Sequence, residues 1–266
     1  MSHWIQNLDR MVIITNNDCN LKCPLCCTGS NKGVGKHHFM RKKWEYSQTN
    51  VKLLFEKLGH LIPAIRLHGG ETTCLDMDKL RTTIDLCEEF SIPISILTNG
   101  YDILGVGEEH LEKFQYIVLN GHGANEEWLD YVQKTLKRSV GTKVYRLKRY
   151  DYWDMDWVAD NSPKTGRVCD SPIGDFGWEY GKIGAFYHDC LYPCCGLFYT
   201  NPDIGDAMRG AGWHVRNPNV EEDTRDLDDL PPEFFDACFN HCAFNALERP
   251  TIDIRRGVTG IPGRVR

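Results

Sequence analysis

The chain has 266 residues, 41% of them hydrophobic, and a formal net charge of −6 at pH 7. This length suits one large domain, or a domain with a small appendage, and the negative charge gives no reason to expect nucleic acid or an anionic membrane as a partner. No apolar run approaches the roughly 20 residues of a membrane span, and the N-terminal MSHWIQNLDR lacks the apolar core of a signal peptide, so we expect a cytoplasmic protein.

The first predicted element leads into a cluster of cysteines. Residues 11–16 are typical of a short β-strand, and DCNLKCPLCC follows at residues 18–27. The cluster contains Cys19, Cys23, Cys26 and Cys27, a CxxxCxxC pattern with one cysteine left over. Taken alone, these residues could bind zinc, form disulfides or bind an iron–sulfur cluster. The chain has 12 cysteines, which in a reducing compartment favours metal ligands over disulfides.

Strand and helix patterns then alternate along the chain. Apolar stripes at helical spacing predict three helices, with Val51, Leu54, Phe55 and Leu58 on the first, Leu80, Ile84 and Cys87 on the second, and Trp128, Val132 and Leu136 on the third. Further β-strands are predicted at residues 64–68, 92–98, 116–120 and 143–147. This alternation predicts an α/β fold, here a partial (β/α) barrel of about five to six parallel strands.

Polar and small residues follow the predicted strands at the points where they end. They are the cysteines after the first strand, Gly69, Gly70 and Glu71 after the second, Asn99 after the third, and Asn120 and His122 after the fourth. Parallel α/β folds build their active sites at the carboxyl ends of the strands. The sequence therefore predicts a site at this edge of the sheet.

The periodicity fades after about residue 150. We expect a first domain at residues 1–150 and a small cysteine-bearing module at residues 151–266. In that module, residues 182–195 are typical of a β-hairpin with its turn near His188 and Asp189. Residues 231–244 predict a helix that carries Cys238 and Cys242 on one face, where both could reach one metal centre.

Three sequence elements together resemble the radical S-adenosylmethionine (SAM) enzymes. They are Cys19-x3-Cys23-x2-Cys26 after the first strand, HGGETT at residues 68–73 after the second, and LTNG at residues 97–100 after the third. Their order and their places at successive strand ends are those of the family, and the resemblance covers about residues 10–150. Three thiolates on a four-iron cluster leave one iron open, whereas a closed site uses four ligands.

The resemblance implies a role for each of these residues. Cys19, Cys23 and Cys26 would hold a [4Fe–4S] cluster whose open iron chelates the amino and carboxylate groups of SAM. Gly69, Gly70 and Glu71 would receive the methionine amino group, and Asn99 and Asn120 would face the ribose or the carboxylate. Leu25 stands where the family often has an aromatic residue and would cover the adenine. Cys27 could replace Cys26 as the third ligand, at a rarer spacing.

The later cysteines resemble the auxiliary-cluster region of the SPASM/Twitch subfamily. A Twitch module binds one further [4Fe–4S] cluster, and the preferred ligands here are Cys169, Cys194, Cys238 and Cys242. Cys190 and Cys195 are alternates for Cys194. Two fully ligated clusters would need eight cysteines and this region has six, which favours Twitch over SPASM. A structural zinc site is the alternative for this set.

The resemblance suggests several reactions. The first is oxidation of a small hydroxylated metabolite, such as an aminocyclitol or amino sugar, as in the Twitch dehydrogenases. The second is crosslinking, epimerisation or oxidation of a short, ribosomally made peptide, and a remote third hypothesis is a non-catalytic zinc or cluster protein. An external electron donor such as flavodoxin or ferredoxin would serve either enzyme. His122, Arg146 and Arg149 are candidates for substrate contact or proton transfer.

Overall fold

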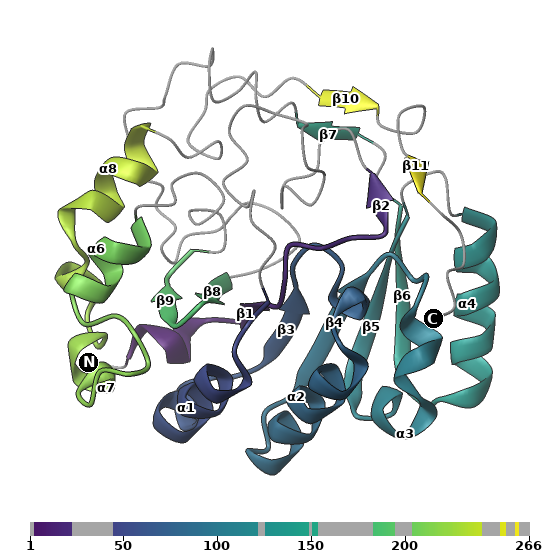
Figure 1. The fold of residues 1–266 in the computed structure, drawn as a ribbon, viewed down its shortest axis with the longest axis horizontal. Coiled ribbons are helices and arrows are strands. Elements are labelled where there is room, and N and C mark those ends of the chain that lie inside the picture. Colours follow the sequence, from purple (N-terminus) through teal and green to yellow (C-terminus); the bar gives the residue numbers. More distant parts are fainter. Residues whose placement is uncertain are drawn as a thin grey trace.

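The computed structural model describes residues 3–22, 45–121, 126–148, 151–153, 183–194, 204–240, 251–253 and 259–260. Its centre is a seven-stranded sheet in the order β6-β5-β4-β3-β1-β8-β9 (Figure 1). The strands are β1 (Arg10–Ile14), β3 (Ile65–His68), β4 (Ile94–Thr98), β5 (Phe114–Gly121), β6 (Lys143–Lys148), β8 (Ile183–Tyr187) and β9 (Cys190–Tyr192). All neighbours pair in parallel except β8 and β9. The predicted α/β class with a mostly parallel sheet is confirmed.

Helices α1 (Gln48–Leu58), α2 (Met77–Glu89), α3 (Glu108–Leu111) and α4 (Glu126–Ser139) connect the strands. Two of them begin at side-chain caps, because Ser47 accepts a hydrogen bond from the Asn50 amide and Asp76 accepts two from the first turn of α2. The predicted stripes on α1 and α2 are buried, Cys87 included. On α4 the buried stripe starts at Leu129 rather than at the predicted Trp128.

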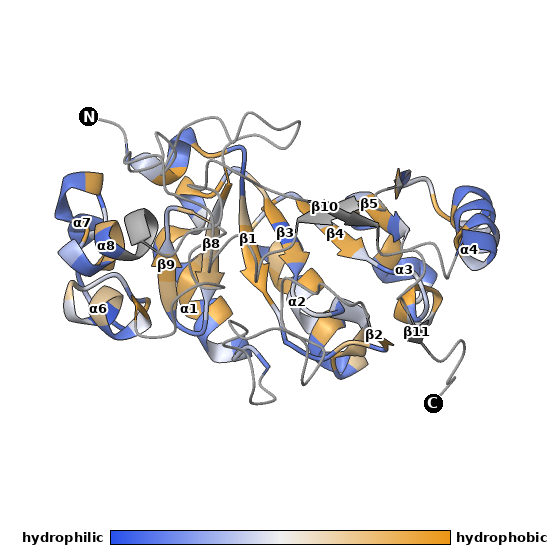
Figure 2. Ribbon diagram, turned by 90° about the horizontal axis from the view of Figure 1, so that it is seen from above, coloured by the Kyte–Doolittle hydropathy of each residue, from blue (hydrophilic) through white to orange (hydrophobic). Residues whose placement is uncertain are grey.

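The main sheet has two unlike faces. Along β3, Ile65 and Leu67 are buried, while the alternate residues Arg66 and His68 are only partly buried. Seen from above in Figure 2, α1, α2 and α3 lie on one side of the apolar strands. Successive side chains of a strand point to opposite faces, so the face that carries Arg66 and His68 is not the one these helices cover. We call it the opposite face.

The predicted β-hairpin is confirmed, but its place in the fold was not predicted. β8 and β9 pair antiparallel around a turn at His188, whose φ of 58° lies in the left-handed region. The hairpin joins the main sheet, because β8 pairs in parallel with β1, with Arg10 opposite Ile183 and Ile13 opposite Phe186. Residues beyond 150 therefore complete the sheet that the N-terminal strands begin.

The rest of the described C-terminal part packs beside this hairpin. It contains α6 (Ile204–Gly210), α7 (Val220–Asp223) and α8 (Pro232–Asn240), the last of which agrees with the predicted helix up to Asn240. Trp213 stacks on Trp4 near the N-terminus, with ring centroids 5.8 Å apart. Two small sheets, β7 (Asp151–Trp153) with β10 (Thr251–Asp253) and β2 (Leu21–Lys22) with β11 (Thr259–Gly260), lie above the main sheet in Figure 1.

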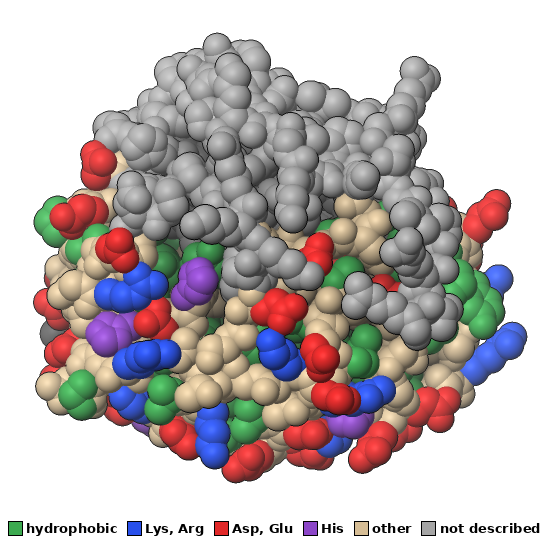
Figure 3. Space-filling view, viewed as in Figure 1, with side chains coloured by type: hydrophobic (Ala, Val, Ile, Leu, Met, Phe, Trp, Pro, Cys, Tyr) green, Lys and Arg blue, Asp and Glu red, His purple; other side chains and the backbone are tan. Residues whose placement is uncertain are grey.

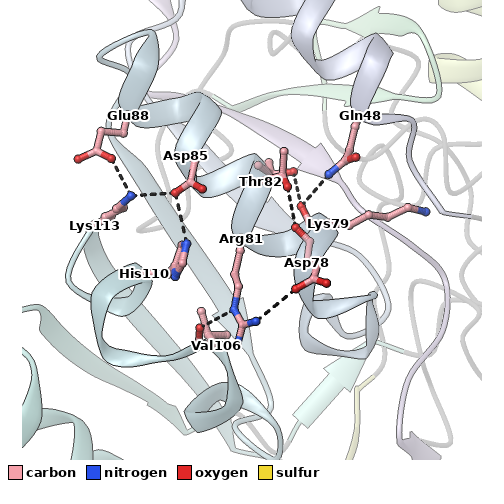
Figure 4. A network of polar contacts seen from close by, with 11 residues as sticks. Gln48, Asp78, Lys79, Arg81, Thr82, Asp85, Glu88, Val106, His110 and Lys113 are labelled. Carbon is pink, nitrogen blue, oxygen red and sulfur yellow. Dashed lines mark hydrogen bonds and ion pairs between the residues drawn. The ribbon is translucent and has the colours of Figure 1, made fainter.

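Polar contacts fix the outer side of α2 to the segment that follows β4 (Figure 4). Lys113 Nζ lies 2.8 Å from Asp85 Oδ1 and 2.7 Å from Glu88 Oε2, and Arg81 donates to the carbonyl of Val106 at 3.0 Å. In Figure 3, acidic and basic side chains alternate over this side of the molecule.

Among the described residues, none of the helices has the length and apolar character that crossing a membrane requires.

Candidate active site at the carboxyl ends of the strands

The segments that follow β1 and β3 continue to pair after both strands end. The amide of Gly70 donates to the carbonyl of Asn16 at 2.8 Å, and the amide of Glu71 donates to the carbonyl of Asp18 at 2.6 Å. The side chain of Asn16 adds a bond from Nδ2 to the carbonyl of Glu71 at 2.9 Å. The loop that carries Cys19 is therefore attached by its backbone to the Gly-Gly-Glu segment.

This close pairing explains the glycine at position 69. A Cβ atom there would lie 2.6 Å from the carbonyl oxygen of Asn16 and 3.0 Å from Oγ1 of Thr15. The nearer obstacle is backbone, so a side chain could be accommodated only by separating the two segments. Gly69 thus serves the approach of two backbones, in addition to any contact with a ligand.

The carboxylate of Glu71 is buried and is used within the protein itself. Oε1 accepts from the amide and hydroxyl of Thr73, at 3.1 and 2.7 Å, and from the Thr98 hydroxyl at 2.6 Å. Oε2 accepts from the amide of Asn99 at 2.7 Å. Burial raises the pKa of Glu71, and these hydrogen bonds act in the opposite direction. The side chain joins the end of β3 to the end of β4, and its expected contact with the methionine amino group stays a prediction.

Cys19 lies beside Asn99 at the same edge. Its Sγ accepts from the amide of Leu21 at 3.3 Å and from Nδ2 of Asn99 at 3.7 Å. Asn99 Nδ2 also donates to Oδ1 of Asn20 at 2.7 Å, and Asn20 donates in turn to Asp102 at 3.0 Å. Asn20 and Asp102 were not predicted. In the sequence, the only signals for a role at this site were that Asn20 follows Cys19 and that Asp102 lies three residues after Asn99.

The fourth strand end presents an acceptor that the described residues leave unused. Oδ1 of Asn120, near the end of β5, is buried and has no hydrogen-bond partner among them. A buried amide oxygen without a donor costs free energy unless a ligand or water supplies one. This position was predicted to face the ribose or carboxylate of SAM.

The residues described at this edge fit the cofactors that the sequence implies. N–H donors directed at the sulfur of Cys19 stabilise a thiolate and therefore suit a cluster ligand. The orphan oxygen of Asn120 suits a ligand that carries a hydroxyl or ammonium donor. Cys23, Leu25, Cys26 and Cys27 lie outside the described residues, so Cys19 alone represents the predicted cluster ligands here.

Of the three candidate catalytic residues, only Arg146 is described, and it has a different role. Its side chain is 8% exposed and forms ion pairs with Glu126 and Asp130 of α4. Arg146 also donates to the carbonyl of Glu126 at 2.9 Å. The side chain holds β6 to α4 and is not available for the substrate contact or proton transfer considered above. His122 and Arg149 lie outside the described residues.

The second cysteine set is described in part. Cys190 is a buried thiol, with Sγ 3.4 Å from Oδ1 of Asp189 and 3.7 Å from the carbonyl of Gly205, and burial raises its pKa. This environment favours a protonated thiol, and the role of Cys190 as an alternate ligand stays a prediction. Cys194 is buried, and Cys238 lies in α8. The other members, Cys169, Cys195 and Cys242, lie outside the described residues, which contain no group of three side chains able to hold a metal ion.

Comparisons with known proteins return solved structures only. No family model and no curated protein match the chain. SuiB from Streptococcus suis bound to S-adenosylmethionine is 13% identical over 70% of this chain and 58% of that one, with a TM-score of 0.37. SuiB bound to precursor peptide SuiA is 10% identical over 86% of this chain and 67% of that one, with a TM-score of 0.40. The chain thus spans 58% and 67% of the length of these two, and similarity at this level does not decide its family.

Proposed function

We propose that the chain is a radical SAM enzyme in which Cys19, Cys23 and Cys26 hold a [4Fe–4S] cluster with one open iron. One observation carries this proposal. Residues 80 positions apart in the sequence meet at the strand ends, where Asn99 donates to the sulfur of Cys19 beside the Gly-Gly-Glu segment. When bound, the cluster and SAM supply reductive cleavage of the sulfonium and a 5′-deoxyadenosyl radical that removes hydrogen from a substrate C–H bond.

The chain's own residues bind and position the cofactors. The segment of Gly69, Gly70 and Glu71 receives the methionine amino group, and the buried carboxylate of Glu71 keeps this segment in place against β4. Asn120 offers its unpaired oxygen to a ribose hydroxyl or to the amino group. Asn99 keeps Cys19 directed toward the site, and Leu25 covers the adenine.

Cofactor turnover tests this proposal directly. The anaerobically reconstituted chain is incubated with SAM and dithionite, and 5′-deoxyadenosine and methionine are measured. Both products are expected, and both should be lost in Cys19→Ala and Cys26→Ala. Cys27→Ala should keep its full iron content. A well-reconstituted chain that forms neither product would support the remote alternative, a non-catalytic zinc or cluster protein.

The C-terminal cysteines are proposed to hold an auxiliary [4Fe–4S] cluster of the Twitch type. Cys169, Cys194, Cys238 and Cys242 are the proposed ligands, with Cys190 and Cys195 as alternates for Cys194. Two four-iron clusters require about eight iron and eight sulfide per chain. Four iron and one zinc per chain would instead indicate the structural zinc site.

Two substrate classes belong to this proposal. One is a small hydroxylated metabolite such as an aminocyclitol or amino sugar, which the enzyme would oxidise or otherwise modify. The other is a ribosomally synthesised peptide that it would crosslink, epimerise or oxidise. In both cases flavodoxin or ferredoxin would be the external electron donor, in the cytoplasm. Deuterium transfer from a labelled candidate into 5′-deoxyadenosine identifies the class, because only a true substrate gives up that hydrogen.

A further inference from the structure

A cationic cluster lies on the opposite face of the sheet, below the strand ends. Nη1 of Arg10 and Nη2 of Arg66 both donate to the phenol oxygen of Tyr116, at 2.8 and 2.9 Å. The guanidinium carbon of Arg66 also lies 5.7 Å from the centre of the Tyr116 ring. Two guanidinium groups thus converge on one oxygen atom from β1 and β3.

The strand register places this cluster on one face. Val12 pairs with Arg66, Arg66 with Ser95, and Ser95 with Tyr116, so these four residues form a row across β1, β3, β4 and β5. Arg10 precedes Val12 by two residues and points the same way. The row ends at Lys143 of β6, which pairs with Tyr116 and adds a third basic residue.

The positive charge of this cluster is only partly offset by the described residues, among which the charge of Asp9 acts on Arg10. In that part of the chain no carboxylate forms an ion pair with Arg10 or Arg66. Nε of Arg66 is buried there without a hydrogen-bond partner. Two nearby guanidinium groups repel each other, and burial together with the charge of Arg66 lowers the pKa of Arg10.

The cluster also favours negative charge on an oxygen atom placed within it. Burial alone would raise the pKa of Tyr116, but the hydrogen bond with Ser95 and the charges of Arg66 and Arg10 lower it overall. Beside it, the ring of Tyr145 contacts that of Tyr116, at 6.0 Å between centroids, and Tyr145 is 54% exposed.

We propose that Arg10, Arg66 and Tyr116 form an oxyanion-binding site that takes a carboxylate or phosphate group of the substrate. Planar guanidinium groups bind both kinds of oxyanion with paired, charge-assisted hydrogen bonds. The assignment to a substrate rests on the function proposed above. Tyr116 lies four residues before Asn120 on β5, about 13 Å along the strand, so the anionic group of the substrate would lie about that far below the proposed SAM contact of Asn120.

Calorimetric titration of the full-length, anaerobically reconstituted chain tests the site. Inorganic phosphate and acetate are titrated separately, and the anion that binds more tightly identifies the group. Loss of one charged hydrogen-bond donor weakens binding by about 10- to 100-fold, which is the effect expected for Arg66→Gln and Arg10→Gln. Arg66→Lys keeps the charge and should lose less. Arg138→Gln, at an exposed position of α4, should bind as the unaltered chain does.

The outcomes separate this proposal from the proposed function. Absence of binding by both anions, or equal binding by the unaltered chain and both glutamine variants, overturns the site. Thermal unfolding of each variant shows whether it is folded. If Arg66→Gln does not fold, anion binding by Arg66→Lys is compared with that of the unaltered chain instead. Formation of 5′-deoxyadenosine without substrate should be unchanged in the control variant Arg138→Gln. If the unaltered chain forms none, the radical SAM proposal fails and the anion-binding result still stands.

Discussion

The carboxylate of Glu71 accepts a hydrogen bond from the backbone amide of Asn99, with 2.7 Å between Oε2 and the nitrogen. This bond joins the residue that ends the Gly-Gly-Glu segment to the residue that contacts Cys19. The two strands β3 and β4 already pair as far as Leu67 and Ile96, and the carboxylate extends their connection beyond the ladder. The edge of the candidate site therefore depends on a buried acid that joins the ends of two strands.

Replacement of Glu71 by Gln should destabilise the fold. The glutamine amide would place N–H donors where the carboxylate now meets donors of Thr73, Thr98 and Asn99. Leaving such buried donors unpaired costs about 1–3 kcal/mol in the free energy of unfolding. Urea denaturation measures this loss, and Glu109→Gln at an exposed position is the matched control. Equal stability of the two variants would contradict the role given to Glu71.

The strands and helices of the first half could be predicted because their residues carry a clear period. Alternation gave β3 and β5, and helical spacing gave α1 and α2. The pairing of β8 with β1 could not be predicted, because a short apolar strand does not specify its partner. The direction of the Glu71 side chain was equally hidden, since it depends on Thr98 and Asn99 of the neighbouring strand.

The direction of the Arg146 side chain could have been predicted from the sequence. Arg146 lies two residues after Val144 on β6, and Val144 is buried. Residues two apart on a strand share a face. Arg146 therefore points with Val144 toward α4, where it meets Glu126 and Asp130.

Replacement of Arg146 by Ala should reduce stability without removing cofactor chemistry. The change leaves the partly buried carboxylate of Glu126 without its cation, and we expect a loss of about 2–3 kcal/mol in the free energy of unfolding. Arg138→Ala, at an exposed position of α4, should change the free energy of unfolding by less than about 0.5 kcal/mol. Formation of 5′-deoxyadenosine per folded chain should equal that of the unaltered protein. A selective loss of product at full stability would restore Arg146 as a catalytic candidate.

The imidazole of His68 should make stability depend on pH. Burial, with a contribution from Arg66, lowers its pKa from 6.5 to about 4. The unfolded chain then binds more protons between these values, so stability is lost as the pH falls from 6.5 toward 4. The whole shift corresponds to about 3 kcal/mol, of which about 2 kcal/mol is lost between pH 7 and pH 4.5.

Chemical denaturation at pH 7 and at pH 4.5 measures this dependence. His68→Gln should remove about 2 kcal/mol of the stability difference between the two pH values. His60→Gln is the control, because the His60 side chain is 59% exposed, with Nε2 3.5 Å from Oε1 of Glu221. If His68→Gln and the unaltered chain lost the same stability on acidification, the assignment of a buried, neutral imidazole to His68 would be wrong.

Replacement of Asn120 by Leu should separate ligand binding from stability. Leucine has a similar size, and it removes the buried oxygen that has no partner among the described residues. We therefore expect the free energy of unfolding to stay the same or to rise by up to about 1 kcal/mol. The reconstituted variant should bind SAM about 10-fold more weakly, because one hydrogen bond of about 1.4 kcal/mol would be lost.

The matched control for this variant is Asn50→Leu. Asn50 is also buried, but its Nδ2 donates to the carbonyl of His188 at 3.1 Å and its Oδ1 accepts from Arg216. This variant should lose about 1–2 kcal/mol of stability and keep its affinity for SAM. Urea denaturation and equilibrium SAM binding are measured for both variants. A loss of stability in Asn120→Leu as large as that of Asn50→Leu, with SAM affinity unchanged, would show that Asn120 serves the fold and not the ligand.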